Sequence, residues 1–149
     1  MAAYFLDTSA LAKLYIREAG TDRMVALASR ADEPQLIILS LSRVELRSAI
    51  RRRVRSRELT QRNAETALAH FGEHMGTVFL VQPLTEAVLE RALTLIDNQG
   101  LRAYDAIQLA ACLTLTVTAA EAFATFVCAD HQLLDAARAE GLTVLNPSE

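Results

Sequence analysis

The chain has 149 residues, a formal net charge of -3 and a hydrophobic share of 52%. This is the length of one compact domain, so we expect residues 1–149 to form a single domain around one core. The small negative charge excludes a general electrostatic attraction to nucleic acid, and the low count of three prolines and five glycines argues against disorder. Cys112 and Cys128 are too few for a disulfide framework or a zinc knuckle, which predicts reduced thiols in a cytoplasmic protein.

Short apolar runs and longer stretches with helical spacing alternate along the chain. The short runs suit strands covered on both faces and lie at residues 4–6, 35–40, 77–81, 123–128 and 143–145. Capping signals and apolar spacing predict helices at residues 10–16, 24–31, 42–54, 60–75, 85–96, 101–118 and 130–140. The pattern predicts an α/β fold with a mostly parallel central sheet of four to five strands and helices on both faces. Helices 42–54 and 60–75 have no strand between them, which predicts a helical hairpin.

One apolar stretch, from Leu109 to Ala129, has about the length of a membrane span. We interpret it as two elements, because helical spacing continues to about Thr118 and an aromatic and β-branched run typical of a central strand begins at Phe123. No basic region precedes the short apolar N-terminal run, so a secretory signal is not expected. The sequence therefore predicts a protein without a membrane segment.

Acidic residues recur where predicted strands end and predicted helices begin. They are Asp7 after the first strand, Glu45 in the helix after the second, Asp105 in the first turn of its helix and Asp130 after the fourth strand. Because the carboxyl ends of parallel strands lie along one edge of a sheet, we expect these carboxylates to converge. An oxygen-only ligand set favours Mg²⁺ or Mn²⁺ over zinc, and a divalent cation offsets the repulsion among the acids.

Each acid also has an alternative role in helix capping. The alternatives are helix caps for Asp7 and Asp130, a capping box with Ser42 for Glu45, and a favourable charge near a helix N-terminus for Asp105. If Asp7 binds a metal, the cap of the first helix falls to Thr8 or Ser9. Taken singly the structural roles are favoured, whereas four such coincidences on one edge favour a metal site.

The segments around these acids resemble the PIN-domain family. They are residues 5–11 (FLDTSAL), 42–45 (SRVE), 101–110 (LRAYDAIQLA) and 126–130 (FVCAD). More narrowly, the chain is similar to the ribonuclease toxins of VapBC-type toxin-antitoxin modules, from Tyr4 to the final strand. One departure is Cys128, where relatives often have threonine or serine, which affects a supporting hydrogen bond near Asp130 but not the acid itself.

The resemblance implies a PIN-like three-layer fold and a magnesium-dependent endoribonuclease that cleaves RNA with a metal-activated water, with Mn²⁺ as an alternative ion. The catalytic, metal-binding residues would be Asp7, Glu45, Asp105 and Asp130, with Thr8 and Ser9 as supporting hydroxyls. Asp130 would complete the site directly or through water. The resemblance further implies a cytoplasmic homodimer held inactive by a small cognate antitoxin.

Arginines dominate the basic residues, since Lys13 is the sole lysine among 15. Seven arginines gather on and after the predicted third helix, and we call this set the basic patch: Arg43, Arg47, Arg51, Arg52, Arg53, Arg55 and Arg57. The patch is either a solvated helix face or a rim that attracts RNA to an acidic crevice. Arg43 and Arg102 are the candidate RNA contacts, although Arg102 could instead pair with one of the acids.

Residues 70–74 (HFGEH) match the H-x-x-E-H pattern of inverted zinc peptidases. Two histidines four residues apart share a helix face. Gly72 weakens that helix and no third ligand is evident, which argues against a zinc site. A zinc-dependent peptidase using His70, Glu73 and His74 is thus one alternative, and a PIN domain that binds RNA or a partner without catalysis is another.

Overall fold

A computed structural model describes residues 2–118 and 124–149 of the chain, and parallel strands form its centre. In these ranges the strands are β1 (Ala3–Leu6), β2 (Gln35–Leu39), β3 (Phe79–Gln82), β4 (Thr125–Val127) and β5 (Val144–Leu145). They lie in the order β3-β2-β1-β4-β5, and every neighbouring pair is parallel. The predicted parallel sheet is confirmed, with β1 at its middle.

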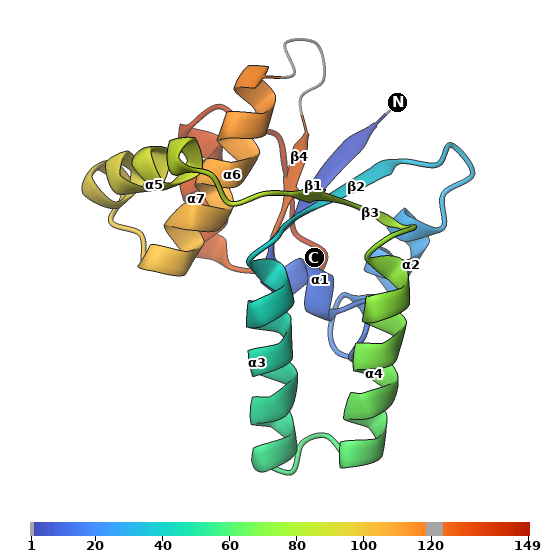
Figure 1. Cartoon of the computed structure of the whole chain (residues 1–149). Helices are drawn as coiled ribbons and strands as arrows, with labels where there is room; N and C mark the ends of the chain where they lie inside the picture. The colour runs from blue at the N-terminus through green and yellow to red at the C-terminus, as the bar shows by residue number, and fades with distance from the viewer. Residues whose placement is uncertain (1, 119–123) are drawn as a thin grey trace.

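Helices cover both faces of this sheet (Figure 1). Those in the described part of the chain are α1 (Thr8–Ala12), α2 (Thr21–Ala28), α3 (Ser42–Arg55), α4 (Gln61–His74), α5 (Glu86–Gln99), α6 (Ala103–Thr118) and α7 (His131–Ala139). Helices α5, α6 and α7 gather on one side, whereas α3 and α4 run side by side and project from the other (Figure 1). The pair α3 and α4 is the predicted helical hairpin.

The core is divided by the sheet because successive strand residues point to opposite faces. Phe5 and Ile37 pack with α5, α6 and α7, while Leu6 and Ile38 pack with α1 to α4. The ring of Phe5 also stacks on Phe126 of β4, with 6.0 Å between the ring centroids. Both faces of the central strands are therefore apolar, as the continuous hydrophobic runs predict, and the fold has three layers.

At two helix starts the structure decides between the predicted roles: it confirms the alternative role of Asp7 as a cap and contradicts the capping box of Ser42 and Glu45. Asp7, and neither Thr8 nor Ser9, caps α1, because its Oδ1 accepts a hydrogen bond from the Ala10 N–H at 2.9 Å. Helix α3 begins after Leu41 without a side-chain cap, so Ser42 and Glu45 do not form the predicted capping box. Both of these side chains instead contact a residue of α6, described below.

Some helices and strands are also shorter than predicted. Helix α1 ends at Ala12 because the next hydrogen bonds, from Leu14 N to Leu11 O and from Tyr15 N to Ala12 O, close tighter turns. The predicted strand 123–128 begins at Thr125, and Phe123 lies outside the described residues. No helix in ranges 2–118 and 124–149 is long and apolar enough to cross a membrane.

Gly20 allows the C-terminal segment to lie against the start of α2. Its φ angle is +92°, and a Cβ atom there would stand 2.8 Å from the Pro147 carbonyl oxygen. The left-handed conformation and this backbone contact both require glycine. Gly72 in α4 differs, because nothing lies within 4 Å of the Cβ position there.

We expect Gly20→Ala to lower the free energy of unfolding by about 1–3 kcal/mol, since the side chain adds strain at a positive φ and displaces the backbone of Pro147. The matched control Gly72→Ala should raise it by up to about 1 kcal/mol, because alanine is the better helix former. Urea unfolding of the two variants measures both effects. Equal midpoints for Gly20→Ala and the wild type would contradict this account.

Candidate active site

The predicted acids lie after central strands or in the first turn of a helix. Asp7 follows β1 directly, Asp130 follows β4, Glu45 lies in the first turn of α3 after β2, and Asp105 lies in the first turn of α6. The charge of Asp105 raises the pKa of both Asp7 and Glu45, and the charge of Asp7 raises the pKa of Glu45. Three acids that are distant in sequence thus interact electrostatically at one edge of the sheet.

Asp7 is the most deeply buried of these acids, with 5% of its surface exposed. Burial raises the pKa of its carboxyl group, which hydrogen bonds from Ser9 and from the Ala10 backbone only partly counteract. Ser9 Oγ donates to Asp7 Oδ1 at 2.7 Å, and the Ala10 N–H donates to the same oxygen. Capping α1 therefore occupies one carboxylate oxygen and does not compete with metal binding through the other.

Glu45 is held by Gln108, a buried residue of α6. Gln108 Nε2 lies within hydrogen-bonding distance of three oxygens: Glu45 Oε1 at 2.9 Å, Ser42 Oγ at 3.0 Å and Thr8 Oγ1 at 3.2 Å. Burial raises the pKa of Glu45, and hydrogen bonds from Gln108 and Thr8 oppose that shift. The amide of Gln108 thus links the ends of β1 and β2 to α6.

Gln108 was not predicted as a site residue. Its Oε1 is buried and accepts no hydrogen bond from any described residue, which is costly for a polar atom. The available signal was its position, a glutamine three residues after Asp105 in an otherwise apolar stretch of α6. On a helix this spacing places the two side chains on the same face.

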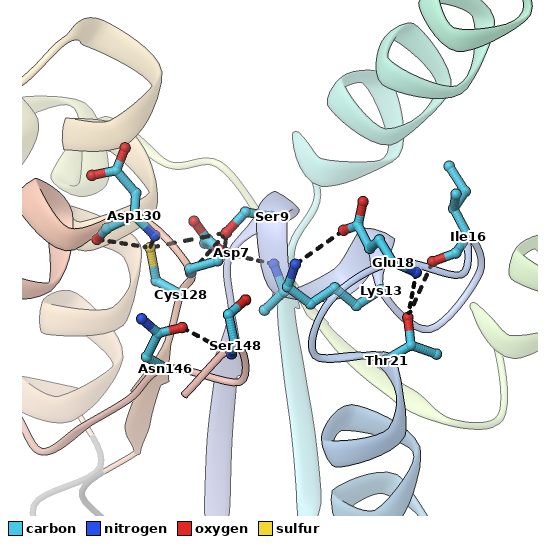
Figure 2. A network of polar contacts seen from close by, with 12 residues as sticks. Asp7, Ser9, Lys13, Ile16, Glu18, Thr21, Cys128, Asp130, Asn146 and Ser148 are labelled. Atoms are coloured by element: carbon cyan, nitrogen blue, oxygen red, sulfur yellow. Dashed lines mark hydrogen bonds and ion pairs between the residues drawn. The ribbon is translucent and has the colours of Figure 1, made fainter. Parts of the chain in front are cut away.

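Asp130 is connected to Asp7 through Ser9 and the backbone after β4 (Figure 2). Ser9 Oγ accepts a hydrogen bond from the Ala129 N–H at 3.1 Å, and the sulfur of Cys128 accepts one from the Asp130 N–H at 3.2 Å. Asp130 also caps α7, with its Oδ1 accepting from the Leu133 N–H at 3.0 Å. The Cys128 thiol therefore supplies an acceptor for the backbone N–H of Asp130.

The donor chemistry of this edge fits a hard divalent cation. Among residues 2–118 and 124–149, no three histidine, cysteine, aspartate or glutamate side chains are already grouped as a metal cage. Mg²⁺ does not require one, because it retains several waters and is usually bound through one or two carboxylates together with substrate phosphates. Carboxylates such as Asp7 and Glu45, whose pKa is raised by burial and by neighbouring acids, are groups that such an ion stabilises.

The residues of the alternative zinc motif are used differently. His70 and Glu73 are exposed on α4, and His74 Nδ1 lies 2.7 Å from the hydroxyl oxygen of Tyr15 in a hydrogen bond. In the part of the chain that the structure describes, no group of three or more potential metal ligands surrounds them. This packing makes His74 part of an aromatic contact with Tyr15 and gives no support to a zinc site.

Two hollows lie beside the acids. One, of about 280 Å³, is lined by Glu45, Arg102, Ala103, Tyr104 and Asp105. The other, of about 260 Å³, is lined by Thr8, Leu41, Val44, Glu45, Ser48, Ala49, Arg52 and Tyr104. Glu45 and Tyr104 contribute to both, and Tyr104 is a second residue that the sequence interpretation did not assign to the site.

Some arginines of the basic patch form ion pairs within the fold, whereas others line a hollow or are exposed. Arg51 pairs with Glu65 at 2.9 Å, which connects α3 to α4 within the hairpin, whereas Arg53 pairs with Glu18 in the segment between α1 and α2. Arg52 lines a hollow with Glu45. Arg43 is exposed, with its Nε donating to the Ser40 carbonyl oxygen at 3.2 Å.

Arg102 pairs with Asp105 at 3.3 Å, while 84% of its side chain remains exposed. The structure thus places this arginine against one of the acids, as one of its two sequence interpretations predicted. Its exposed guanidinium also lines the hollow that contains Glu45.

A second polar network lies at the other end of α1 from Asp7 (Figure 2). Lys13, with 6% of its surface exposed, pairs with Glu18 at 3.1 Å, and Arg53 of α3 pairs with the other oxygen of Glu18. Burial would raise the pKa of Glu18, but the hydrogen bonds from Arg53 and Lys13 outweigh it and hold the pKa below its ordinary value. This network fixes α3, and hence Glu45, relative to α1.

Residues 4–139 match the sequence model of the PIN domain. The chain belongs to the PIN-domain family. No curated protein matches this PIN domain significantly in sequence. Solved structures share its fold across nearly the whole chain.

One is FitAcB from Neisseria gonorrhoeae, at 18% identity and a TM-score of 0.68, covering 97% of each chain. A second is VapC20 from Mycobacterium tuberculosis, described as a toxin that cleaves the sarcin-ricin loop, at 20% identity and a TM-score of 0.65, covering 94% of this chain and 96% of that one. A third is a toxin-antitoxin complex from Klebsiella pneumoniae, at 20% identity and a TM-score of 0.60, covering 98% of both chains. At these identities the likeness concerns the fold.

We expect Glu18→Gln to lower the free energy of unfolding by roughly 1.5–3 kcal/mol at neutral pH, because it leaves Lys13 buried without a charged partner. Since the pKa of Glu18 is lower in the folded state than its ordinary 4.5, its contribution is complete above pH 4.5 and is lost as the pH falls through the folded value. The stability difference from the wild type should therefore shrink on acidification below about pH 4.5.

The control for this variant is Asp22→Asn, which removes an ion pair with Arg17 in which both side chains are mostly exposed. It should change stability by less than about 1 kcal/mol. Denaturant unfolding of both variants at about five pH values between pH 3 and pH 7 measures these stability differences. A pH-independent difference for Glu18→Gln would contradict the assignment.

Proposed function

We propose that this PIN domain is a magnesium-dependent endoribonuclease that hydrolyses phosphodiester bonds of RNA. The observation that carries the proposal is the gathering of acids at the carboxyl edge of the sheet: Asp7 directly follows β1, and Glu45 and Asp105 line one hollow. The charge of Asp105 also contributes to the raised pKa of Asp7 and Glu45, after the larger effect of burial. The similarity in fold to VapC20, described as a toxin that cleaves the sarcin-ricin loop, supports a nuclease. Mn²⁺ is expected to replace Mg²⁺, since both prefer oxygen ligands.

The residues that would hold the ion are Asp7, Glu45 and Asp105, and Asp130 would complete the site directly or through water. A bound Mg²⁺ would supply Lewis acidity toward a phosphate oxygen and lower the pKa of a water molecule. Ser9 and the Ala10 N–H orient the Asp7 carboxylate, and Gln108 orients that of Glu45. These buried hydrogen bonds keep the carboxylates in place without the reorganisation that flexible acids would need.

Arginines at the rim offset the repulsion between RNA phosphates and the acids. Arg102 and Arg52 each line a hollow that contains Glu45, and Arg43 is exposed on the same turn of α3 as Val44. Guanidinium groups bind phosphate through paired hydrogen bonds. We assign Arg43 and Arg102 to RNA contact, with Arg102 releasing Asp105 when a phosphate or an ion arrives.

The proposal includes a role as the toxin of a toxin-antitoxin pair in the cytoplasm, as a homodimer inhibited by a small cognate antitoxin. Its support is the fold shared with the toxin-antitoxin complex from Klebsiella pneumoniae. A small open reading frame adjacent to the gene, whose product suppresses the activity on co-expression, is the expected finding. Sedimentation of the purified chain, alone and with that product, tests the dimer.

We expect Asp7→Asn to abolish magnesium-dependent cleavage of RNA while the fold is retained. The asparagine oxygen can still accept the hydrogen bond from the Ala10 N–H. The variant also lacks the buried carboxyl group, whose pKa burial raises, so the protein should not become less stable. Cleavage of a labelled RNA is measured with and without Mg²⁺, and circular dichroism checks the fold. Full activity in this variant would contradict the metal-site assignment.

Two controls separate this proposal from its alternatives. After EDTA treatment, Mg²⁺ should restore RNA cleavage and Zn²⁺ should not, and His70→Ala should remain active because His70 is exposed on α4. Mg²⁺ should also raise the melting temperature of the wild type more than that of Asp7→Asn, by linkage. Zinc-dependent peptidase activity that is lost in His70→Ala would favour the peptidase instead.

We expect Gln108→Ala to lower RNA cleavage by roughly 10- to 100-fold, as is usual for residues that orient metal ligands. The matched control is Gln82→Ala, because Gln82 also donates its amide hydrogen, to the Ala111 carbonyl oxygen, and also has an unpartnered buried Oε1 among the described residues. Gln82 lines neither hollow. Equal losses in the two variants would show that Gln108 acts only through stability.

A further inference from the structure

Tyr104 differs from the other two tyrosines because its side chain has no bonding partner in the described part of the fold. The hydroxyl oxygen of Tyr4 accepts a hydrogen bond from Arg30 at 2.7 Å, and Tyr15 bonds His74 and packs edge-on against Phe71. Tyr104 is 62% exposed, and its side chain makes no hydrogen bond or ring contact with any residue in ranges 2–118 and 124–149. A large exposed aromatic ring with no partner in the fold is a candidate for contact with a ligand.

The position of this ring connects it to the acids. Tyr104 precedes Asp105 in the first turn of α6 and lines both hollows that contain Glu45. Val44, which is 65% exposed, lines one of these hollows from α3. The walls of this hollow therefore include exposed side chains with apolar surface from two helices, together with the carboxylate of Glu45.

The charges around the hollows indicate what occupies them. Arg102 lines one hollow and Arg52 the other, so each combines an apolar wall with a guanidinium group. A nucleotide has the matching parts, because its base is a flat apolar surface and its phosphate is an anion. The base must be free to leave its neighbours, which favours single-stranded RNA over a duplex.

We propose that Tyr104 stacks on a nucleobase of single-stranded RNA adjacent to the phosphate that is cleaved, with Val44 facing the same base. This inference rests on the proposed endoribonuclease activity and adds a residue that determines how the substrate is positioned. Removing a stacking aromatic side chain typically weakens binding by roughly 5- to 100-fold per base. Tyr104 is thus assigned to substrate binding and not to the stability of α6.

The absence of tryptophan from the chain gives a direct test. Tyr104→Trp introduces a single tryptophan at the proposed stacking position, whose emission can be excited apart from the remaining tyrosines, and Asp7→Asn in the same chain prevents cleavage. A single-stranded oligoadenylate of about 12 nucleotides, long enough for one nucleotide-binding surface, should quench this fluorescence to saturation. An abasic oligomer of the same length should bind more weakly and leave the emission unchanged.

The matched control is Leu93→Trp, at an exposed position of α5 that lines neither hollow. Its emission should not respond to the oligoadenylate. Equal quenching by the abasic oligomer, or equal quenching at position 93, would overturn the proposal. The absence of any quenching at position 104 would also overturn it, as expected if a partner protein rather than RNA covers the ring.

Substitution of the ring itself supplies a second readout. Tyr104→Ala should raise KM for RNA roughly 5- to 100-fold with little change in kcat, whereas Tyr104→Phe should resemble the wild type because stacking does not need the hydroxyl. Both variants should have the same melting temperature as the wild type, since the side chain of Tyr104 is exposed. An unchanged KM in Tyr104→Ala, together with an inactive Asp7→Asn variant, would contradict the stacking role and still support the nuclease. Full cleavage by Asp7→Asn would instead contradict the proposed function itself.

Discussion

Burial of one carboxylate close to others is the constraint on which this arrangement depends. Asp7 ends the central strand β1, and its backbone is held by a hydrogen bond from its N–H to the Val127 carbonyl oxygen at 3.1 Å. The acid therefore cannot move into solvent without disturbing the buried residues Phe5 and Leu6 that precede it. Its charge is opposed by burial and by Asp105, and the bonds from Ser9 and Ala10 offset only part of that cost. The proposed cation at this edge would offset that repulsion by binding the carboxylates.

The order of elements follows closely from local physics. The continuous apolar runs that become β1 and β2 are too short for helices, and their burial on both faces is the usual environment of parallel strands. Capping residues also predict several helix starts, since Thr60 caps α4 and Thr85 caps α5, as the sequence indicates. Because the strands are parallel, the edge at which Asp7 and Glu45 meet follows from the same pattern.

Partners that depend on tertiary distance could not be predicted in this way. Ser42 and Glu45 have the spacing of a capping box, but both side chains contact Gln108, which lies 66 and 63 residues away in sequence. A buried amide requires acceptors, and this requirement outweighs a local cap that solvent can replace. The basic patch shows the same limit. Spacing on α3 indicates a charged surface, but only the fold shows that Arg51 and Arg53 pair with Glu65 and Glu18.

The buried pairing of Lys13 has a consequence for the chemistry of the protein surface. Because Lys13 is the sole lysine, acylating reagents and lysine acetylation have no exposed lysine side chain to modify. Among lysine and arginine, the surface cations of the described chain are therefore guanidinium groups, whose charge persists at any pH in which proteins stay folded. Attraction of a polyanion to these arginines is consequently set by salt concentration, and a change in pH acts on the carboxylates they surround.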